Sequence, residues 1–362
     1  MSIRTKTLCC VVVLSQLALS VGCAEPKRPV AVSSVPRAAP VAPQAAPPTA
    51  APTASPAPSA TEEARQPVPA PAPQPDDINA ADGAGWTKLH RAAQSGDVGA
   101  IQDLVQRGAS LEARAKDGDT PLLTALRYGR PEAAKALVNA GASIDVKGDS
   151  ETTPLHLAAL GGMVEVVALF LKKGAAIEAR DNVGHTPLHP AATYGHADVV
   201  AKLTAAGAKV DAAGDDGLTP LHWAITTDKL DAVRALLKAG AKLDKKTTDG
   251  ATPLHHAILA NRPRTMYRHT DMGADTGFVH TTRTVHQNEP KLVAFLLAKG
   301  ASITARDNEG NTPLHYAAMH GNAAAAKLLL ARGASRAAKN KDGKTPLDLA
   351  GARDELIALL KK

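Results

Sequence analysis

The motif Thr-Pro-Leu-His, or a close variant of it, recurs along this chain every 33 residues. Its threonines are Thr87, Thr120, Thr153, Thr186, Thr219, Thr252, Thr312 and Thr345. Only the step from Thr252 to Thr312 differs, because it is 60 residues long and carries 27 extra residues. A fixed period of this length is typical of a stacked solenoid, in which each unit contacts only its neighbours. The period therefore indicates a row of small units, not a globule around one core.

Each unit has the local signals of two short helices. In the third unit, Thr153 is a favourable N-cap, and Pro154 suits the first helical position, where no backbone N–H is needed. Apolar residues at helical spacing follow in 155–159 and again in 164–171. Gly174 then suits the left-handed end of the second helix. The sequence predicts a helix pair in every unit.

The motif and its register resemble those of the ankyrin repeat family over about four-fifths of the chain. The resemblance implies an all-α solenoid of about eight repeats, each with two antiparallel helices and a protruding β-turn. It also implies a curved array whose concave face is made of turn tips and first helices. Finally, it implies that six motif histidines make hydrogen bonds that join neighbouring units: His90, His156, His189, His222, His255 and His315.

Some units depart from the motif. Pro190 lies one turn into the first helix of the fourth unit, where it removes a backbone hydrogen bond, so we expect a local weakness there. The last unit, 340–362, is shortened and is predicted to be a C-terminal cap. Ile78 is predicted to begin an N-terminal cap, which places the repeat domain at residues 78–362.

The first 22 residues have the three parts of an export signal. Arg4 and Lys6 form a basic region, the run from Leu8 to Leu19 is mostly apolar, and small residues precede Cys23. The apolar run is shorter than the ~20 residues that span a bilayer, which argues against a transmembrane anchor. We expect residues 1–22 to be a signal peptide.

The end of this signal, Ser20-Val21-Gly22-Cys23, resembles the lipobox of bacterial lipoproteins. The resemblance implies cleavage after residue 22 and lipidation of Cys23, although Ser20 stands where that family usually has leucine. Ordinary cleavage after Ala24, which would release a soluble exported protein, is the alternative. The rest of 23–77 is rich in alanine and proline, has little to bury and is predicted to be a disordered tether.

Composition favours binding over catalysis. The net charge of +7 comes from interspersed residues, not from a concentrated basic stripe, so nucleic acid is not an indicated partner. All three cysteines, Cys9, Cys10 and Cys23, lie near the N-terminus, which leaves the repeats without disulfides or Cys-based zinc sites. No nucleophile elbow, phosphate-binding loop or zinc-helix motif occurs. We predict a monomer that is not an enzyme and needs no cofactor.

The 27 extra residues, about 262–288, lie between the two helices of the sixth unit. They contain His269, His280 and His286, which are residues of a metal-ligating type, but their spacing matches no ligand signature. A solvated or partly ordered loop is the favoured interpretation. A partner-binding loop and a metal site are the alternatives, since long loops are often functional.

The resemblance also implies where a partner would bind. In ankyrin repeat proteins, contacts come from the turn residue before the motif threonine and from positions late in the first helix. The candidate partner-binding residues here are Trp86, Asp119, Arg127, Tyr128, Leu160, His185, Tyr194 and Met319. Three of them are aromatic in a chain with only 2% aromatic residues, and Trp, Tyr and Arg dominate interface hot spots.

These features lead to one principal hypothesis. The chain is predicted to be an envelope-anchored bacterial lipoprotein, with its repeat domain in the periplasm, that docks a partner protein on the concave face. One alternative is an envelope protein that binds a metal or small ligand through its insertion. Others are a soluble periplasmic protein and a secreted ankyrin protein that acts on a host.

Overall fold

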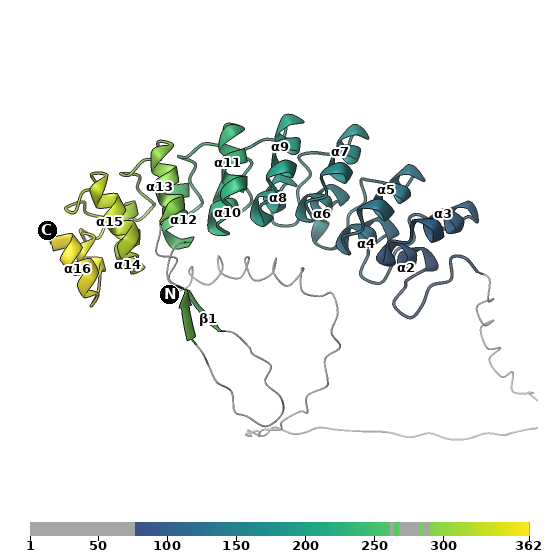
Figure 1. Ribbon diagram of the computed structural model, residues 1–362, viewed down its shortest axis with the longest axis horizontal. Helices are drawn as coiled ribbons and strands as arrows, with labels where there is room; N and C mark the ends of the chain where they lie inside the picture. The colour runs from purple at the N-terminus through teal and green to yellow at the C-terminus, as the bar shows by residue number, and fades with distance from the viewer. Residues whose placement is uncertain (1–76, 261–263, 268–281, 286–289, 362) are drawn as a thin grey trace, which may run out of the picture. The chain divides into compact units, whose positions relative to one another are not determined.

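The repeat domain is a row of helix pairs, seen in a computed structural model (Figure 1). The structure describes residues 77–260, 264–267, 282–285 and 290–361. The predicted signal peptide, Cys23 and most of the Ala/Pro-rich tether lie outside the described residues. The structural unit that holds the repeats begins at Ile78, whose side chain packs against the core.

Seven units consist of two α-helices each. The first helices are α2 (Lys88–Ser95), α4 (Pro121–Arg127), α6 (Pro154–Leu160), α8 (Leu188–Tyr194), α10 (Pro220–Thr226), α12 (Pro253–Ala260) and α14 (Pro313–Met319). The second helices are α3 (Val98–Gln106), α5 (Pro131–Asn139), α7 (Val164–Lys172), α9 (Ala197–Ala205), α11 (Leu230–Lys238), α13 (Lys291–Ala298) and α15 (Ala323–Ala331). The last unit pairs a 3-10 turn, η2 (Leu347–Leu349), with α16 (Asp354–Lys361), and a further 3-10 turn, η1 (Asp149–Glu151), precedes the third unit.

Successive units stack helix on helix. First helices pack against first helices, as α8 and α12 do on either side of α10, and second helices pack likewise. The row curves, with the first helices on its inner side (Figure 1). We call the surface of the first helices and their preceding turns the concave face. The prediction of an all-α ankyrin-type solenoid is confirmed.

The described part of the insertion forms two β-strands, unlike the helical repeats. Strand β1 (Arg264–Tyr267) pairs antiparallel with β2 (Thr282–Val285), with Arg264 opposite Val285. The Thr-Arg-Thr-Val sequence of β2 has the β-branched residues that strands favour. The sequence interpretation was a loop, so this hairpin is a finding of the structure. The metal candidates His269, His280 and His286 lie outside the described residues.

In most units the motif residues start the first helix as the sequence predicted. Thr153 is the N-cap of α6 and Pro154 its first residue. The side chain of His156 turns back so that Nδ1 lies 3.3 Å from the Thr153 backbone N–H and 2.8 Å from its hydroxyl, which completes a capping box. The same box starts α2, α10 and α14. After α7, Gly174 adopts a φ of +86°, the left-handed end that was expected.

The core is a continuous strip of alanine and leucine along the row. Ala158 and Leu155 of α6 are almost fully buried, and equivalent residues recur in every unit. Alanine allows neighbouring helices to approach closely, while leucine fills the space between the two helices of a unit. Burial of this apolar surface, at about 25 cal/mol per Å², is the main favourable contribution to stacking.

Hydrogen bonds from arginine side chains and from the turn backbones also join neighbouring units at the edges of the row. Arg114 Nη1 donates to Gly118 O at 2.9 Å and to Lys147 O of the next unit at 3.1 Å. Arg180 and Arg306 repeat this bridge in later units. Along the turns, the backbone N–H of one unit donates to a carbonyl of the unit before, as between Lys116 and Ala84 at 3.0 Å. Every interface therefore combines apolar burial with satisfied backbone groups.

Pro190 leaves α8 without one backbone donor, as the sequence indicated. In the third unit, the backbone N–H of Leu157 donates to Thr153 O at 3.2 Å, and Pro190 occupies the equivalent position without an N–H. The first turn tightens instead, with His189 N donating to Thr186 O at 2.9 Å, and α8 begins one residue late, at Leu188. The fourth unit thus lacks one helical hydrogen bond that its neighbours have.

We therefore predict that Pro190→Leu stabilises the array. The change restores the donor and matches Leu157 in the preceding unit, so the free energy of unfolding should rise by about 1 kcal/mol. Urea denaturation followed by circular dichroism measures the change. The reverse substitution, Leu157→Pro, is the matched control and should lower stability. An unchanged or lower midpoint for Pro190→Leu would contradict this account.

Candidate functional site

The motif histidines join neighbouring units, as the sequence analysis expected. Their Nδ1 atoms face the motif threonine, and their Nε2 atoms reach a backbone carbonyl of the next unit. For His156 that acceptor is His185 O at 3.0 Å, and for His255 it is Asn311 O at 3.3 Å. His90, His189 and His315 make the same contact. His222 is the exception, since its Nε2 has no hydrogen bond of regular geometry in the described part of the chain.

These contacts favour neutral histidines. Because Nδ1 accepts the threonine N–H, the single proton of the ring belongs on Nε2, which donates to the carbonyl. Burial lowers the pKa of His189 and of His222 to about 3, and that of His255 to about 4, while carbonyl contacts oppose the shift only in part. Burial also lowers the pKa of His156 and of His315. The ladder is structural, and its rings are held in one tautomer.

At the N-terminal end of the concave face, Trp86 and Tyr128 form an aromatic pair. Their ring centroids lie 6.1 Å apart with the planes at 86°, an edge-to-face arrangement. Both side chains are half-buried, so each keeps a surface open to solvent. The guanidinium of Arg91 lies 5.7 Å from the centroid of the Trp86 ring and is itself paired with Asp82. The structure thus brings two predicted site residues together.

Asp119 and Arg127, two further predicted site residues, bind each other. Arg127 Nε and Nη2 donate to the two carboxylate oxygens of Asp119 at 2.7 and 2.9 Å. This fork geometry is the strong form of the Arg–carboxylate pair, and the contact raises the pKa of Arg127. Asp119 is only 3% exposed, so it supports Arg127 and offers little surface to a partner.

We predict that Arg127→Ala lowers the stability of the array by about 2 kcal/mol, because the buried Asp119 carboxylate loses its counterion. The loss is smaller than for a fully buried pair, since the Arg127 side chain is 20% exposed. Arg107→Ala is the matched control, because its pair with Asp103 is exposed and should contribute little. Urea midpoints of the two variants measure the difference. Equal midpoints would show that the Asp119 pair contributes no more than a surface pair.

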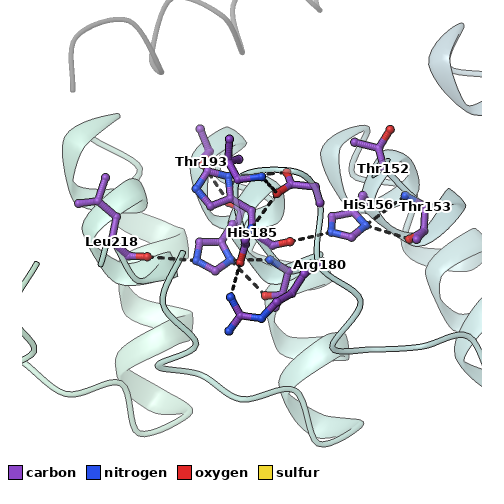
Figure 2. Close-up of polar contacts among 12 residues, drawn as sticks. Thr152, Thr153, His156, Arg180, His185, Thr193 and Leu218 are labelled. Carbon is purple, nitrogen blue, oxygen red and sulfur yellow. Dashed lines mark hydrogen bonds and ion pairs between the residues drawn. The ribbon is translucent and has the colours of Figure 1, made fainter. Parts of the chain in front are cut away.

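His185 is also buried, at 4% exposure, although it was predicted to contact a partner. Its ring stacks on His189 at 4.8 Å and meets the edge of Trp223 at 5.4 Å. Figure 2 shows its surroundings: His156 points at the His185 backbone, while Arg180 lies below it. Burial lowers the pKa of His185. Neither His185 Nε2 nor Trp223 Nε1 has a hydrogen-bond partner in the part of the chain that the structure describes.

Asp119 and His185, the two buried residues among the candidates, point along the row toward a glycine 29 residues later in the sequence. A Cβ at Gly148 would lie 3.2 Å from Asp119 Oδ1, and one at Gly214 would lie 2.7 Å from His185 Cδ2. The other units have larger residues at this position, such as Asp181 and Asp307. The glycine makes room for Asp119 and His185, although Leu218 and Asn311 are buried with Thr247 and Asn340 at the same position.

The remaining candidates lie farther along the concave face. Leu160 and Tyr194 are half-buried and share a neighbour, His196. His196 Nε2 lies 2.9 Å from Leu160 O, and its ring is parallel to that of Tyr194 at 6.5 Å. Burial raises the pKa of Tyr194. Met319, at the end of α14, is half-buried and belongs to a separate part of the face, three units farther on.

The sequence analysis missed three residues that directly follow a motif histidine, Trp223, His256 and Tyr316. His256 meets the ring of His222 at 5.0 Å, and Tyr316 meets that of His255 at 4.6 Å. Trp223 is buried, whereas His256 and Tyr316 are half-buried on first helices. The signal was their shared position. Each of the three lies one residue after the motif histidine of its unit, so all three lie on the same side of their first helices.

The described residues give no sign of metal chemistry. Among them, no three His, Cys, Asp or Glu side chains gather closely enough to hold an ion. The acidic pair Asp215-Asp216 belongs to the repeat turn, where Asp215 N donates to Val183 O at 3.1 Å. Over the same described ranges, every helix is too short or too polar to cross a membrane.

The comparison with protein families agrees with this geometry. A family model for ankyrin repeats, three copies long, matches residues 70–148, 145–214, 203–267 and 283–362. The chain belongs to the ankyrin repeat family. The motif histidines, the capping boxes and the hydrogen bonds between turns are the structural features that agree with this family. No curated protein sequence matches the chain.

Among solved structures, the ankyrin repeat array is similar to the crystal structure of the ankyrin repeat domain of Bcl-3, described as a unique member of the IkappaB protein family. The TM-score is 0.52 with 26% identical residues, and the match covers 77% of this chain and 99% of that chain. The similarity supports the same stacked-helix architecture over most of the repeat domain.

Proposed function

We propose that this ankyrin repeat protein is a non-enzymatic scaffold that binds a partner protein on the concave face of its array. The observation that carries the proposal is the half-exposed Trp86–Tyr128 pair on that face, in a chain with 2% aromatic residues. A rigid array has little conformational entropy to lose when it docks a partner, so modest contact areas can suffice. Arg127, Leu160 and Tyr194 extend the contact surface, with Met319 as a separate contact. Asp119 and His185 act as supports beneath it.

We further propose that the protein acts in the bacterial cell envelope, held by lipid on Cys23, with the array in the periplasm. The export signal and the lipobox-like Ser20-Val21-Gly22-Cys23 support this part. More than one acyl chain would give stable anchoring, since each buried methylene contributes about 0.8 kcal/mol. Labelling with a fatty-acid analogue should tag the native protein, and Cys23→Ala should abolish the label. A native protein that takes up no label would exclude the anchor.

In-cell photo-crosslinking tests partner binding. A crosslinking residue at Gln94 or Ser95 reports on the concave face at the C-terminal end of α2, the helix whose N-terminal end follows Trp86. The matched control is Lys172 at the exposed end of α7 on the opposite side. We expect a discrete protein adduct from the concave positions alone, and its loss in a Trp86→Ala/Tyr128→Ala double variant. Equal adducts from both faces would remove the proposal. An adduct that survives the double variant would remove the site assignment.

A further inference from the structure

The fifth, sixth and seventh units each combine a carboxylate with an aromatic ring on the concave face. Each carboxylate lies three residues before a motif threonine, and each ring directly follows a motif histidine. The three pairs are Asp216 with Trp223, Asp249 with His256, and Glu309 with Tyr316. We propose that this carboxylate–aromatic patch binds an extended segment of the partner protein that has Lys or Arg at every third residue. The inference rests on the proposed docking of a partner protein on the concave face, and it specifies the chemistry of that partner.

The turns of the patch carry an excess of negative charge. Residues 214–218, 247–251 and 307–311 contain five carboxylates and no Lys or Arg. Within the described residues, no ion pair includes any of the five. Asp249 and Glu309 are exposed, and Asp216 is half-buried. Because opposite charges steer and orient partners, a cationic segment fits these turns.

The cations beside the patch lie at its border. Arg180 Nη1 and Arg306 Nη1 each donate to two backbone carbonyls at the base of a turn. Lys246 Nζ donates to Arg306 O at 2.9 Å. The others are Lys245, before the sixth turn, and Lys341 and Lys344, in the eighth unit. The patch is therefore confined to three units, with carboxylates at the turn tips and cations around them.

The carboxylates lie close to the rings of the same units. Burial raises the pKa of Tyr316, and the carboxylates of Asp307, Asp249 and Glu309 raise it further. Burial lowers the pKa of His256 to about 4, while Asp249 opposes this shift. Both rings are half-buried and keep a surface open to solvent. A Lys or Arg side chain can thus pack its carbon stem against a ring while its charged end reaches a carboxylate.

The fifth unit adds hydrogen-bonding atoms that lack partners. In the described part of the chain, His185 Nε2 and Trp223 Nε1 make no hydrogen bond, and neither residue is more than 4% exposed. His185 Nε2 faces the same space as Asp216 Oδ1, since both lie 3.1 Å from the position that a Gly214 Cβ would occupy. His185 Nδ1 lies 3.8 Å from Asp181 Oδ2, which favours the ring proton at Nδ1 and leaves Nε2 as an acceptor. An acceptor beside a carboxylate suits the several N–H donors of a guanidinium, so arginine fits this unit.

The spacing of the units selects an extended segment. The first helices α10, α12 and α14 pack in succession, and packed helices lie about 8–10 Å apart. In polyproline II, each residue rises about 3.1 Å, and every third residue lies on one side. Every third side chain of such a segment therefore advances by about 9 Å and meets the next unit. Three successive units thus accept cations at positions i, i+3 and i+6 of the segment.

Fluorescence anisotropy of labelled peptides mixed with the full chain tests the inference. The probe has Arg at positions i, i+3 and i+6, with Pro, Ser and Ala between them. Its matched control has the same composition with the three Arg adjacent. We expect the spaced peptide to bind about fivefold more tightly, because the adjacent arginines cannot reach all three units. Binding should weaken between about 50 and about 300 mM salt, since exposed ion pairs are screened.

A charge variant of the full chain assigns the binding to the patch. It removes three charges and keeps their acceptor oxygens: Asp216→Asn, Asp249→Asn and Glu309→Gln. The dissociation constant of the spaced peptide should rise about tenfold. The matched control removes three exposed carboxylates from the first turns of α7, α9 and α11: Glu165→Gln, Asp198→Asn and Asp231→Asn. The control has the same net charge as the patch variant and should change binding far less. Circular dichroism checks that each variant is folded.

Tyr316→Leu separates the aromatic contribution from the charge and should weaken binding about threefold. Three results would each overturn the inference: no binding of the spaced peptide, equal affinities of the two peptides, or equal affinities of the native chain and the patch variant. The crosslink expected from Gln94 is independent of these outcomes. A discrete adduct there without peptide binding would keep the scaffold proposal and remove its basic ligand. Selective peptide binding without that adduct would keep this patch and remove the contact site at Trp86 and Tyr128.

Discussion

At pH 5 we expect the array to unfold at a much lower urea concentration than at pH 7. The reason is a set of neutral histidines, three of them buried and the fourth, His256, half-buried. Burial lowers the pKa of His189 and His222 to about 3 and that of His255 and His256 to about 4, whereas the same residues titrate near 6.5 when the chain is unfolded. Between these values the unfolded state binds more protons than the folded state. Stability is therefore complete above pH 6.5 and falls as the pH drops toward 4.

The expected loss is large. Each of these groups contributes about 1.4 kcal/mol per pH unit within its window, so together they remove several kcal/mol of a stability that is typically ~5–15 kcal/mol. Urea midpoints at pH 7, 6 and 5 measure it. His256→Gln is the matched variant, since it removes one titrating ring whose polar contact is a single 3.3 Å approach to Thr226 Oγ1. The variant should lose less stability on acidification. A midpoint independent of pH between 7 and 5 would contradict the neutral ladder.

Gly217→Ala should divide the array into two parts that unfold separately. Gly217 has a φ of +77°, and a Cβ there would lie 2.6 Å from the backbone nitrogen of Thr248 in the next turn. No side-chain rotation relieves that contact, so the next turn must move. Left-handed strain and overpacking together should cost about 3 kcal/mol at this one interface. Because solenoid stability is a sum over units and interfaces, the weakened one becomes a boundary.

Two probes distinguish the parts. Trp86 and Trp223 both lie before the weakened interface, so their fluorescence reports on the N-terminal units, whereas circular dichroism at 222 nm reports on all helices. The two urea transitions should coincide in the native protein and separate in Gly217→Ala. Gly207→Ala is the control, because its φ is +96° and a Cβ would meet nothing within 4 Å. It should cost about 1 kcal/mol from backbone strain alone and keep a single transition.

Most of the fold follows from local sequence rules. The motif sets the period, threonine and proline start the first helix, and a glycine ends the second, all of which the structure reproduces. The missing donor at Pro190 was also predictable, because it is a property of the residue itself, whereas the later start of α8 was not predicted. The β1–β2 hairpin was not, since the insertion carries no repeat pattern and its strands depend on pairing between positions far apart in sequence.

The concave face was less predictable than the frame. The sequence located its residues but not their orientation, because orientation depends on the neighbouring unit. Asp119 and His185 turn inward over Gly148 and Gly214, whereas Trp86 packs edge to face with Tyr128 and keeps part of its surface open. The depressed histidine pKa values also depend on tertiary burial.

The insertion in the sixth unit leaves the stack undisturbed. Across it, His255 still lies 3.3 Å from Asn311 O, Lys246 Nζ donates to Arg306 O at 2.9 Å, and Asn322 Nδ2 donates to Ile258 O at 3.0 Å. These bonds span the point where α12 ends and α13 begins, so the frame does not depend on what lies between. Mutations can therefore change the length and chemistry of the insertion without loss of the array. Related chains can then differ in what this segment binds while they keep the same fold.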